Sequence, residues 1–127
     1  MPPLQRHVAT LLMLALQAGA ALPARAAPDA KAQREITALL TFVGQSHCSF
    51  VRNGKSYGGE QAQGHLEDKF HYLLRRDQVN TAEDFIDRAA TRSSLSGEPY
   101  QVICDGRQQT SAAWLNDELR RMRQREP

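Results

Sequence analysis

Two cysteines, Cys48 and Cys104, place the strongest constraint on how this chain of 127 residues can fold. In an oxidising compartment a lone pair of cysteines forms a disulfide, which here would close a loop of about 57 residues. Loop-closure entropy gives such a bond roughly 4 kcal/mol of stabilisation, a large share of the about 5–15 kcal/mol that holds a small domain folded. The alternative is a redox or metal site with two free thiols, which the absence of a C-x-x-C motif disfavours.

The first 26 residues have the three parts of a secretory signal peptide. Arg6 and the α-amino group precede an apolar run from Val8 to Leu22, and Ala24-Arg25-Ala26 matches the small-x-small pattern of a cleavage site. The apolar run is about 15 residues long, fewer than the roughly 20 that span a membrane. We therefore expect cleavage after Ala26, a periplasmic or secreted location, and no membrane span in the mature protein. An uncleaved membrane anchor is the alternative.

The charge of the mature chain argues against nucleic acid as a partner. The full sequence holds 16 basic and 14 acidic residues, and removal of Arg6 and Arg25 makes the two numbers equal. A neutral domain has no overall field to attract nucleic acid or an acidic membrane.

Apolar residues recur at helical spacing in four segments, which predicts four helices. Glycine, Thr or Ser residues stand where such helices would begin or end. The expected limits are Gly44 for the end of the first helix, Gly58-Gly59 and Arg76 for the second, Thr81 for the start of the third, and Thr110 or Ser111 for the start of the last.

Asn53-Gly54 lies between two short alternating runs and predicts a β-hairpin. A two-residue type I′ turn needs positive φ at both central positions, which Asn and Gly tolerate best. In this register Arg52 faces Lys55 and Phe50 faces Tyr57. The aromatic pair, on the same strand face as the first cysteine, is interpreted as core.

A third strand is expected over Tyr100–Cys104, where side chains alternate, and Asp105-Gly106 then turns the chain away. The order helix, hairpin, helix, helix, strand, helix lacks the repeated βαβ units of a parallel sheet. We predict one α+β domain over residues 35–125, with a small three-stranded sheet packed against about four helices. Residues 27–34 are small and polar, and we interpret them as a flexible mature N-terminus.

Several motifs, each weak alone, together resemble a family of short exported bacterial proteins that is catalogued as a domain of unknown function. The resemblance covers roughly Glu35 to Arg121, and it implies secretion and paired cysteines but no activity, substrate or cofactor. Gly58-Gly59 departs from a more helix-friendly stretch, which leaves the start of the second helix open. The motifs are C-x-F-x-R-N-G from Cys48, A-x-x-H-L-x-x-K from Ala62, S-S-L-S-G-x-P-Y-x-V-x-C from Ser93 and W-L-x-x-E-L from Trp114.

The loop from Ser93 to Tyr100 is the best candidate for a binding site. Its three hydroxyls, its glycine and nearby backbone N–H groups could bind an anion or a peptide carboxylate. The alternative is a structural loop that ends a helix and sets Tyr100 in the sheet, with serines capping free backbone groups. The residues expected to bind a ligand are Ser93, Ser94, Ser96, Gly97, Tyr100 and Arg52.

His65 and Lys69 lie one helical turn apart beside the apolar stripe of the second helix, and are weak catalytic candidates. In a cleft, His65 could carry a proton. The alternative is a half-buried histidine and a lysine whose stem covers core surface. A serine hydrolase would pair His65 with a loop serine, but no G-x-S-x-G surrounds any of them.

Metal binding finds little support in the sequence, and we expect no metal or cofactor. His65 and His71 are six residues apart, which places them on different helix faces, and there is no H-E-x-x-H motif. Both thiols are also expected to be used in the disulfide.

The sequence favours a non-enzymatic binding or interaction module whose partner is another envelope protein or a peptide. One alternative is a small hydrolase-like enzyme that uses His65, Lys69 and a loop serine. That enzyme requires His65 to lie within hydrogen-bond reach of a loop hydroxyl. The other alternative is a structural envelope protein without a discrete site.

Overall fold

The computed structural model describes residues 27–127, together with Pro3, Ala15 and Gly19. The signal peptide predicted for residues 1–26 therefore lies, apart from those three positions, outside the described residues. No helix in this described part is long and apolar enough to cross a membrane. The elements in chain order are α1 (Ala30–Gln45), β1 (Ser49–Arg52), β2 (Lys55–Tyr57), α2 (Gly59–Leu74), α3 (Ala82–Ala89), β3 (Gln101–Cys104), β4 (Arg107–Thr110) and α4 (Ser111–Arg125).

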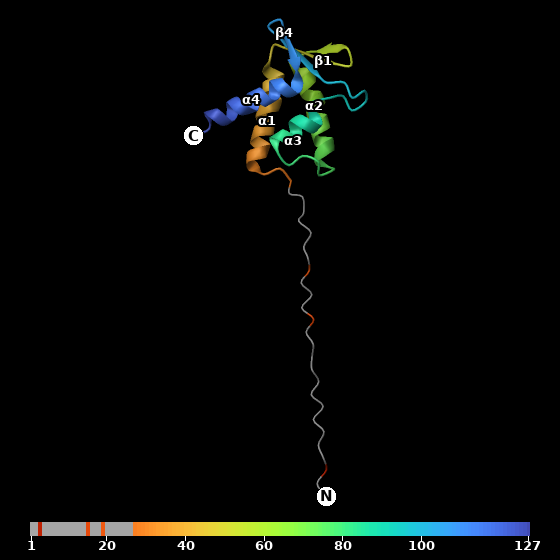
Figure 1. Ribbon diagram of the computed structural model, residues 1–127, viewed down its shortest axis with the longest axis vertical. Helices are drawn as coiled ribbons and strands as arrows, with labels where there is room; N and C mark the ends of the chain where they lie inside the picture. The colour runs from red at the N-terminus through yellow and green to blue at the C-terminus, as the bar shows by residue number, and fades with distance from the viewer. Residues whose placement is uncertain (1–2, 4–14, 16–18, 20–26) are drawn as a thin grey trace.

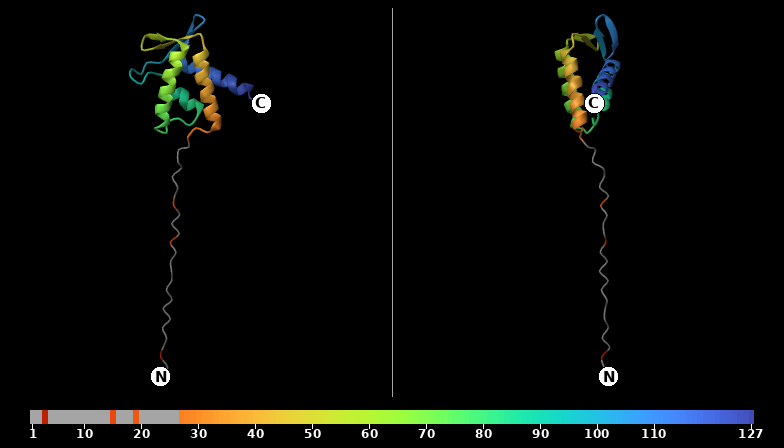
Figure 2. Two further views of the ribbon diagram at one scale, coloured as in Figure 1. Left: turned by 180° about the vertical axis from the view of Figure 1, so that it is seen from behind. Right: turned by 90° about the vertical axis from the view of Figure 1, so that its left-hand side faces the viewer.

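The helices form two layers, and the sheet lies at one end of them (Figure 1). Helices α1 and α2 are neighbours in one layer, while α3 and α4 lie in the other (Figure 2). The apolar stripes of all four helices meet between the layers. Trp114 of α4 is buried and stacks on Phe42 of α1 with ring centroids 4.4 Å apart. The largest side chains that are fully buried are Phe85, Ile36, Leu39, Ile86, Leu115, Val43, Val79 and Val102.

The sheet is antiparallel throughout, with the strand order β2-β1-β3-β4. The predicted hairpin register is confirmed, because Phe50 pairs with Tyr57 and Arg52 with Lys55. The turn has positive φ at both central residues, 51° at Asn53 and 77° at Gly54. The predicted disulfide is also present, and its Cα atoms are 4.6 Å apart. It joins the residue before β1 to the last residue of β3, so it ties together the two central strands.

The expectation of three strands is wrong, because β4 adds a fourth. Asp105 and Gly106 have φ of 49° and 77°, so they form a second hairpin turn of the same kind instead of leading the chain away. The Asp-Gly pair carried that signal. The strand after it reads Arg-Gln-Gln-Thr, without apolar alternation, because it is an edge strand whose side chains are mostly exposed.

The limits of α1 differ from those expected at both ends. The helix begins at Ala30, since the Asp29 side chain caps it by accepting a hydrogen bond from the N–H of Ala32 at 2.8 Å. Residues 30–34, which the sequence placed in a flexible terminus, are therefore helical. The helix also continues through Gly44 and is capped by Ser46. A single glycine costs a helix only about 1 kcal/mol and need not end it.

The start of α2, left open by the sequence, lies at Gly59, where the two helices of one layer meet. A Cβ atom at this position would lie 2.6 Å from the carbonyl oxygen of Val43 in α1. Glycine is therefore required here for close approach of two backbones. At its other end the helix stops at Leu74, two residues before the expected limit at Arg76.

Replacing Gly59 with alanine should destabilise the fold. The added methyl group forces α1 and α2 apart, and we expect urea denaturation to show a loss of about 1–3 kcal/mol in the free energy of unfolding. Gly64→Ala is the matched control, because nothing lies within 4 Å of the added Cβ. That change should raise stability by up to about 1 kcal/mol. Equal stability of Gly59→Ala and the unchanged protein would contradict the close approach.

One arginine fastens the last helix to the other layer. Arg123 of α4 donates two hydrogen bonds to the carboxylate of Glu35 in α1, at 2.9 and 3.0 Å, and a third to Glu83 in α3. Glu35 is only 4% exposed. The hydrogen bonds from Arg123 are the main cause that lowers the pKa of both carboxyls below their usual value of 4.5, although burial opposes this.

This arrangement predicts acid sensitivity with a defined cause. A carboxyl whose pKa is lowered in the folded state adds stability above its unfolded pKa near 4.5, and that stability is lost as pH falls through the lower folded pKa. Arg123→Met should remove part of this acid-dependent loss in denaturation curves between pH 5 and pH 2. At pH 7 it should cost about 2 kcal/mol, after allowing for the partial exposure of Arg123. Arg120→Met, on the exposed side of α4, is the control. An unchanged pH dependence in Arg123→Met would contradict the assignment.

Candidate ligand-binding pocket

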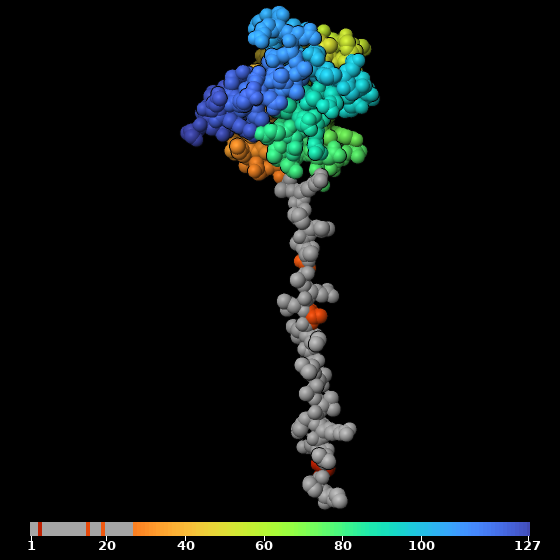
Figure 3. All heavy atoms as spheres, viewed as in Figure 1, coloured from red at the N-terminus to blue at the C-terminus, as the bar shows by residue number. Residues whose placement is uncertain are grey.

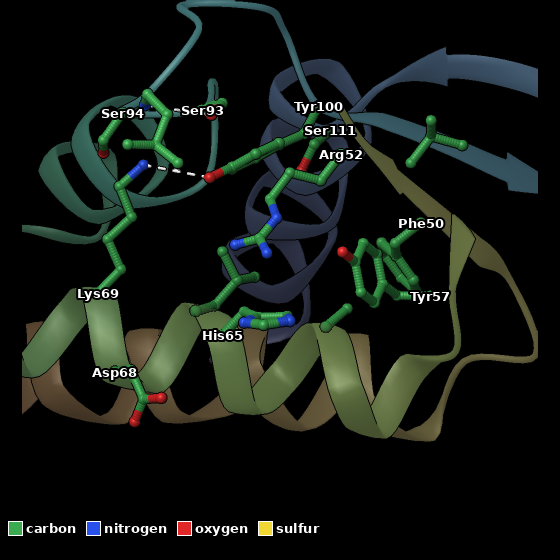
Figure 4. A pocket seen from close by; sticks show the side chains of 14 residues that line it. Phe50, Arg52, Tyr57, His65, Asp68, Lys69, Ser93, Ser94, Tyr100 and Ser111 are labelled. Carbon is green, nitrogen blue, oxygen red and sulfur yellow. Dashed lines mark hydrogen bonds between the residues drawn. The ribbon is translucent and has the colours of Figure 1, made fainter. Parts of the chain in front are cut away.

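A pocket of about 350 Å³ opens between the β1–β2 hairpin, helix α2 and the loop that precedes β3 (Figure 4). This volume lies at the small end of the range, about 300–1,000 Å³, that is typical of small-molecule sites. The residues that line the pocket come from segments that are distant in the sequence. The hairpin contributes one face of its strands, the helix contributes the flank of its buried stripe, and the loop covers the remaining side.

The inner wall of the pocket is apolar. Phe50 of β1 and Leu66 of α2 are 9% and 7% exposed, and both line the cavity. Tyr57 faces Phe50 across the hairpin, and its ring meets the His65 ring edge to face at 5.2 Å between centroids. The cross-strand pairing predicted from the Asn-Gly turn thus supplies two sides of this hollow.

Two cations border the same hollow. Arg52 is two residues after Phe50, so both side chains leave the same face of β1, and its guanidinium lies 5.3 Å from the Tyr57 ring centroid. Lys69 donates hydrogen bonds to the backbone carbonyl of Arg92 at 2.7 Å and to the Tyr100 hydroxyl at 3.3 Å.

No carboxylate among residues 27–127 balances these two charges. Within the described chain, neither Arg52 nor Lys69 makes an ion pair. Asp68 borders the cavity, but its carboxylate points away from the hollow, as Figure 4 shows. The pocket therefore presents positive charge beside apolar surface.

Burial and nearby positive charges shift the pKa values of Lys69 and Tyr100. Burial lowers the pKa of Lys69, and the nearby charges of Arg52 and Arg92 lower it further. Burial also raises the pKa of the Tyr100 hydroxyl, an effect that the Arg52 charge opposes. Since the charged form of Lys69 is disfavoured here, an anion in the pocket would stabilise it.

Ser111, the first residue of α4, adds a hydroxyl to the wall. The residue is only 4% exposed, and its hydroxyl makes no hydrogen bond to any residue that the structure describes, because Thr110 caps the helix instead. Every fully enclosed side-chain nitrogen or oxygen in the described chain has a partner. The Ser111 hydroxyl must therefore open onto the pocket that it lines.

The loop before β3 protrudes beside the hairpin (Figure 3) and is latched to the hairpin turn. The Asn53 amide donates to the buried Ser93 hydroxyl at 3.1 Å and accepts a hydrogen bond from the Ser96 hydroxyl. The Ser93 oxygen also accepts the backbone N–H of Leu95 at 3.2 Å. Two of the three loop serines thus hold the loop in place.

The structure brings together most of the predicted site residues. Arg52, Ser93, Ser94, Tyr100, His65 and Lys69 all line this pocket, whereas Ser96 and Gly97 do not. Gly97 instead supplies a turn with φ of 74°. The sequence missed the contributions of Tyr57, Leu66 and Ser111. Tyr57 is interpreted as core in the sequence analysis, and Ser111 is one of two candidate helix caps there.

The geometry required by the hydrolase alternative is not formed. No hydrogen bond joins His65 to a loop serine among the residues described, and its ring contacts Tyr57 instead. The described residues also hold no group of three or more side chains able to ligate a metal.

The latch predicts a variant that frees the loop without breaking the hairpin. Asn53→Gly keeps positive φ at the turn but removes both hydrogen bonds to the loop. We expect faster amide hydrogen exchange at Leu95 and Ser96, a loss of about 1 kcal/mol in global stability, and unchanged strand pairing. The matched control is Asp105→Gly in the second hairpin turn, which should leave the loop protected. Unchanged exchange in Asn53→Gly would show that Asn53 does not hold the loop.

The fold and pocket define a small disulfide-closed α+β domain with a cation-bordered apolar hollow. The chain belongs to the family of unknown function DUF5329, whose sequence profile matches residues 30–123. It is also similar to the uncharacterized protein YfeK of Salmonella typhimurium strain LT2, at 40% identity over 80 residues. That match covers 62% of this chain and 65% of the relative. No solved structure gives a significant match. The family resemblance read from the sequence is thereby confirmed.

Proposed function

We propose that this protein is a small periplasmic or secreted binding module that captures the acidic end of an apolar ligand. The observation that carries the proposal is the convergence of Arg52 and Lys69 on one apolar pocket that no carboxylate of the described residues faces. The signal-like leader supports export, and the disulfide is compatible with an oxidising compartment.

The energetics favour an amphiphilic ligand. Partly buried cations without a counter-ion lose hydration and gain no ion pair, so an anion that enters the pocket offsets this cost. A charge-assisted hydrogen bond in such surroundings contributes about 1.5–3 kcal/mol. An apolar group attached to the anion would cover the remaining exposed surface of Phe50 and Leu66, which adds about 25 cal/mol per Å² of area removed from water.

Binding is favoured over catalysis by the state of the candidate catalytic groups. Lys69 is already held by two acceptors, the Arg92 carbonyl and the Tyr100 hydroxyl. The His65 side chain makes no hydrogen bond to a serine hydroxyl in the described chain, and its ring contacts Tyr57. These groups suit a fixed recognition surface better than proton transfer.

The proposal is tested with a simple probe, 3-phenylpropionate, and its neutral analogue 3-phenylpropanamide. Calorimetric or NMR titration should show that the acid binds and that the amide binds at least about tenfold more weakly. Arg52→Gln and Lys69→Met should each weaken binding of the acid by about tenfold. The apolar stem of the methionine keeps the packing of Lys69 while removing its charge.

Two exposed residues near the hairpin turns serve as controls. Arg107 borders the second turn and Lys55 the first, and neither lines the pocket. Arg107→Gln and Lys55→Met should bind the acid like the unchanged protein. If the acid and the amide bind equally, or if the control variants weaken binding as much as Arg52→Gln and Lys69→Met, the proposal is wrong.

A further inference from the structure

Ser111 indicates that the ligand carries a second polar group besides its acid. Its hydroxyl lines the pocket in a residue that is 96% buried, and it makes no hydrogen bond to the described chain. A ligand with one acidic head and a plain hydrocarbon body would place methylene groups against this hydroxyl and deprive it of water. Leaving a buried hydroxyl without a partner is unfavourable, so such a ligand is a poor match.

The hydroxyl lies where a helix N-terminus reinforces binding of polar groups. Ser111 is the first residue of α4, a helix of 15 residues, and the partial positive charge at that end favours an electron-rich group. Ser111, Arg52 and Lys69 come from α4, β1 and α2, so the polar groups of the pocket stand on three separate walls. A ligand that satisfies all of them has more than one hydrogen-bonding group within a short length.

The size and rim of the pocket favour one residue at the end of a longer molecule. The cavity of about 350 Å³ is small for a ligand-binding site. At its rim Leu95 is 96% exposed even though it borders the cavity. An exposed leucine beside Ser94 gives the rim an apolar side chain and a hydroxyl, which a chain leaving the pocket could contact.

We propose that the pocket binds the C-terminal residue of a peptide. The free α-carboxylate lies between Arg52 and Lys69, the last peptide group hydrogen-bonds to Ser111, and an apolar last side chain packs on the inner wall. The inference rests on the function proposed above and specifies its ligand. A peptide terminus has an acid, an amide and a side chain on adjacent atoms, which is the combination that these walls would satisfy.

The experiment compares three probes on the disulfide-bonded protein: the peptide acetyl-Gly-Gly-Phe with a free carboxylate, the same peptide with a C-terminal amide, and 3-phenylpropionate. We expect the peptide acid to bind at least about tenfold more tightly than the peptide amide and more tightly than 3-phenylpropionate. Ser111→Ala should weaken the peptide acid by about fivefold to tenfold and leave 3-phenylpropionate within about twofold. Its thermal stability should be unchanged, since the Ser111 side chain makes no hydrogen bond to any other residue that the structure describes. Ser56→Ala, on the exposed strand β2, should change neither affinity.

The outcomes separate this inference from the proposed function. Binding of 3-phenylpropionate without binding of the peptide acid would overturn the peptide assignment and leave the proposed function standing. Equal binding of peptide acid and peptide amide, or tighter binding of 3-phenylpropionate than of the peptide acid, would also overturn it. Failure of every acid to bind would overturn both.

Discussion

The disulfide between Cys48 and Cys104 fixes the two central strands on which the pocket depends. It joins positions 56 residues apart and lies where β1 pairs with β3. Phe50 and Arg52 extend from β1, while Tyr100 stands immediately before β3. A cross-link here keeps both walls close together, because it removes the chain entropy of bringing them together. The loop before β3 and helix α2 form the remaining sides of the pocket.

Local chemistry was enough to predict the parts of the fold that depend on short stretches of chain. The Asn53 turn sets its hairpin register, and Thr81 caps α3 by accepting the N–H of Asp84, as the sequence indicates. β4 was missed because the side chains of an exposed edge strand need not alternate between apolar and polar. The only sequence signal for it is the hairpin turn at Asp105-Gly106. The early start of α1 was missed because Asp29 precedes residues whose small size resembles a flexible tail.

The candidate site was predicted in part, and the division has a physical cause. The loop serines were expected to bind a ligand, but Ser93 and Ser96 are engaged by Asn53 from 40 and 43 residues away. Such contacts between distant segments leave no trace in local spacing. Ser111 was hidden for a related reason, since two hydroxyl residues in a row can each cap a helix, and only the structure shows which one is left free.

The Glu35–Arg123 contact closes the domain between its first and last helices, which are 88 residues apart. During synthesis the ribosome adds Glu35 well before Arg123. Until α4 has emerged, α1 holds a carboxylate with no cation beside it, and the core between the layers lacks Trp114 and Leu115. The native network between the two layers therefore cannot be completed until α4 is available to pack, so it depends on contacts between residues far apart in the sequence.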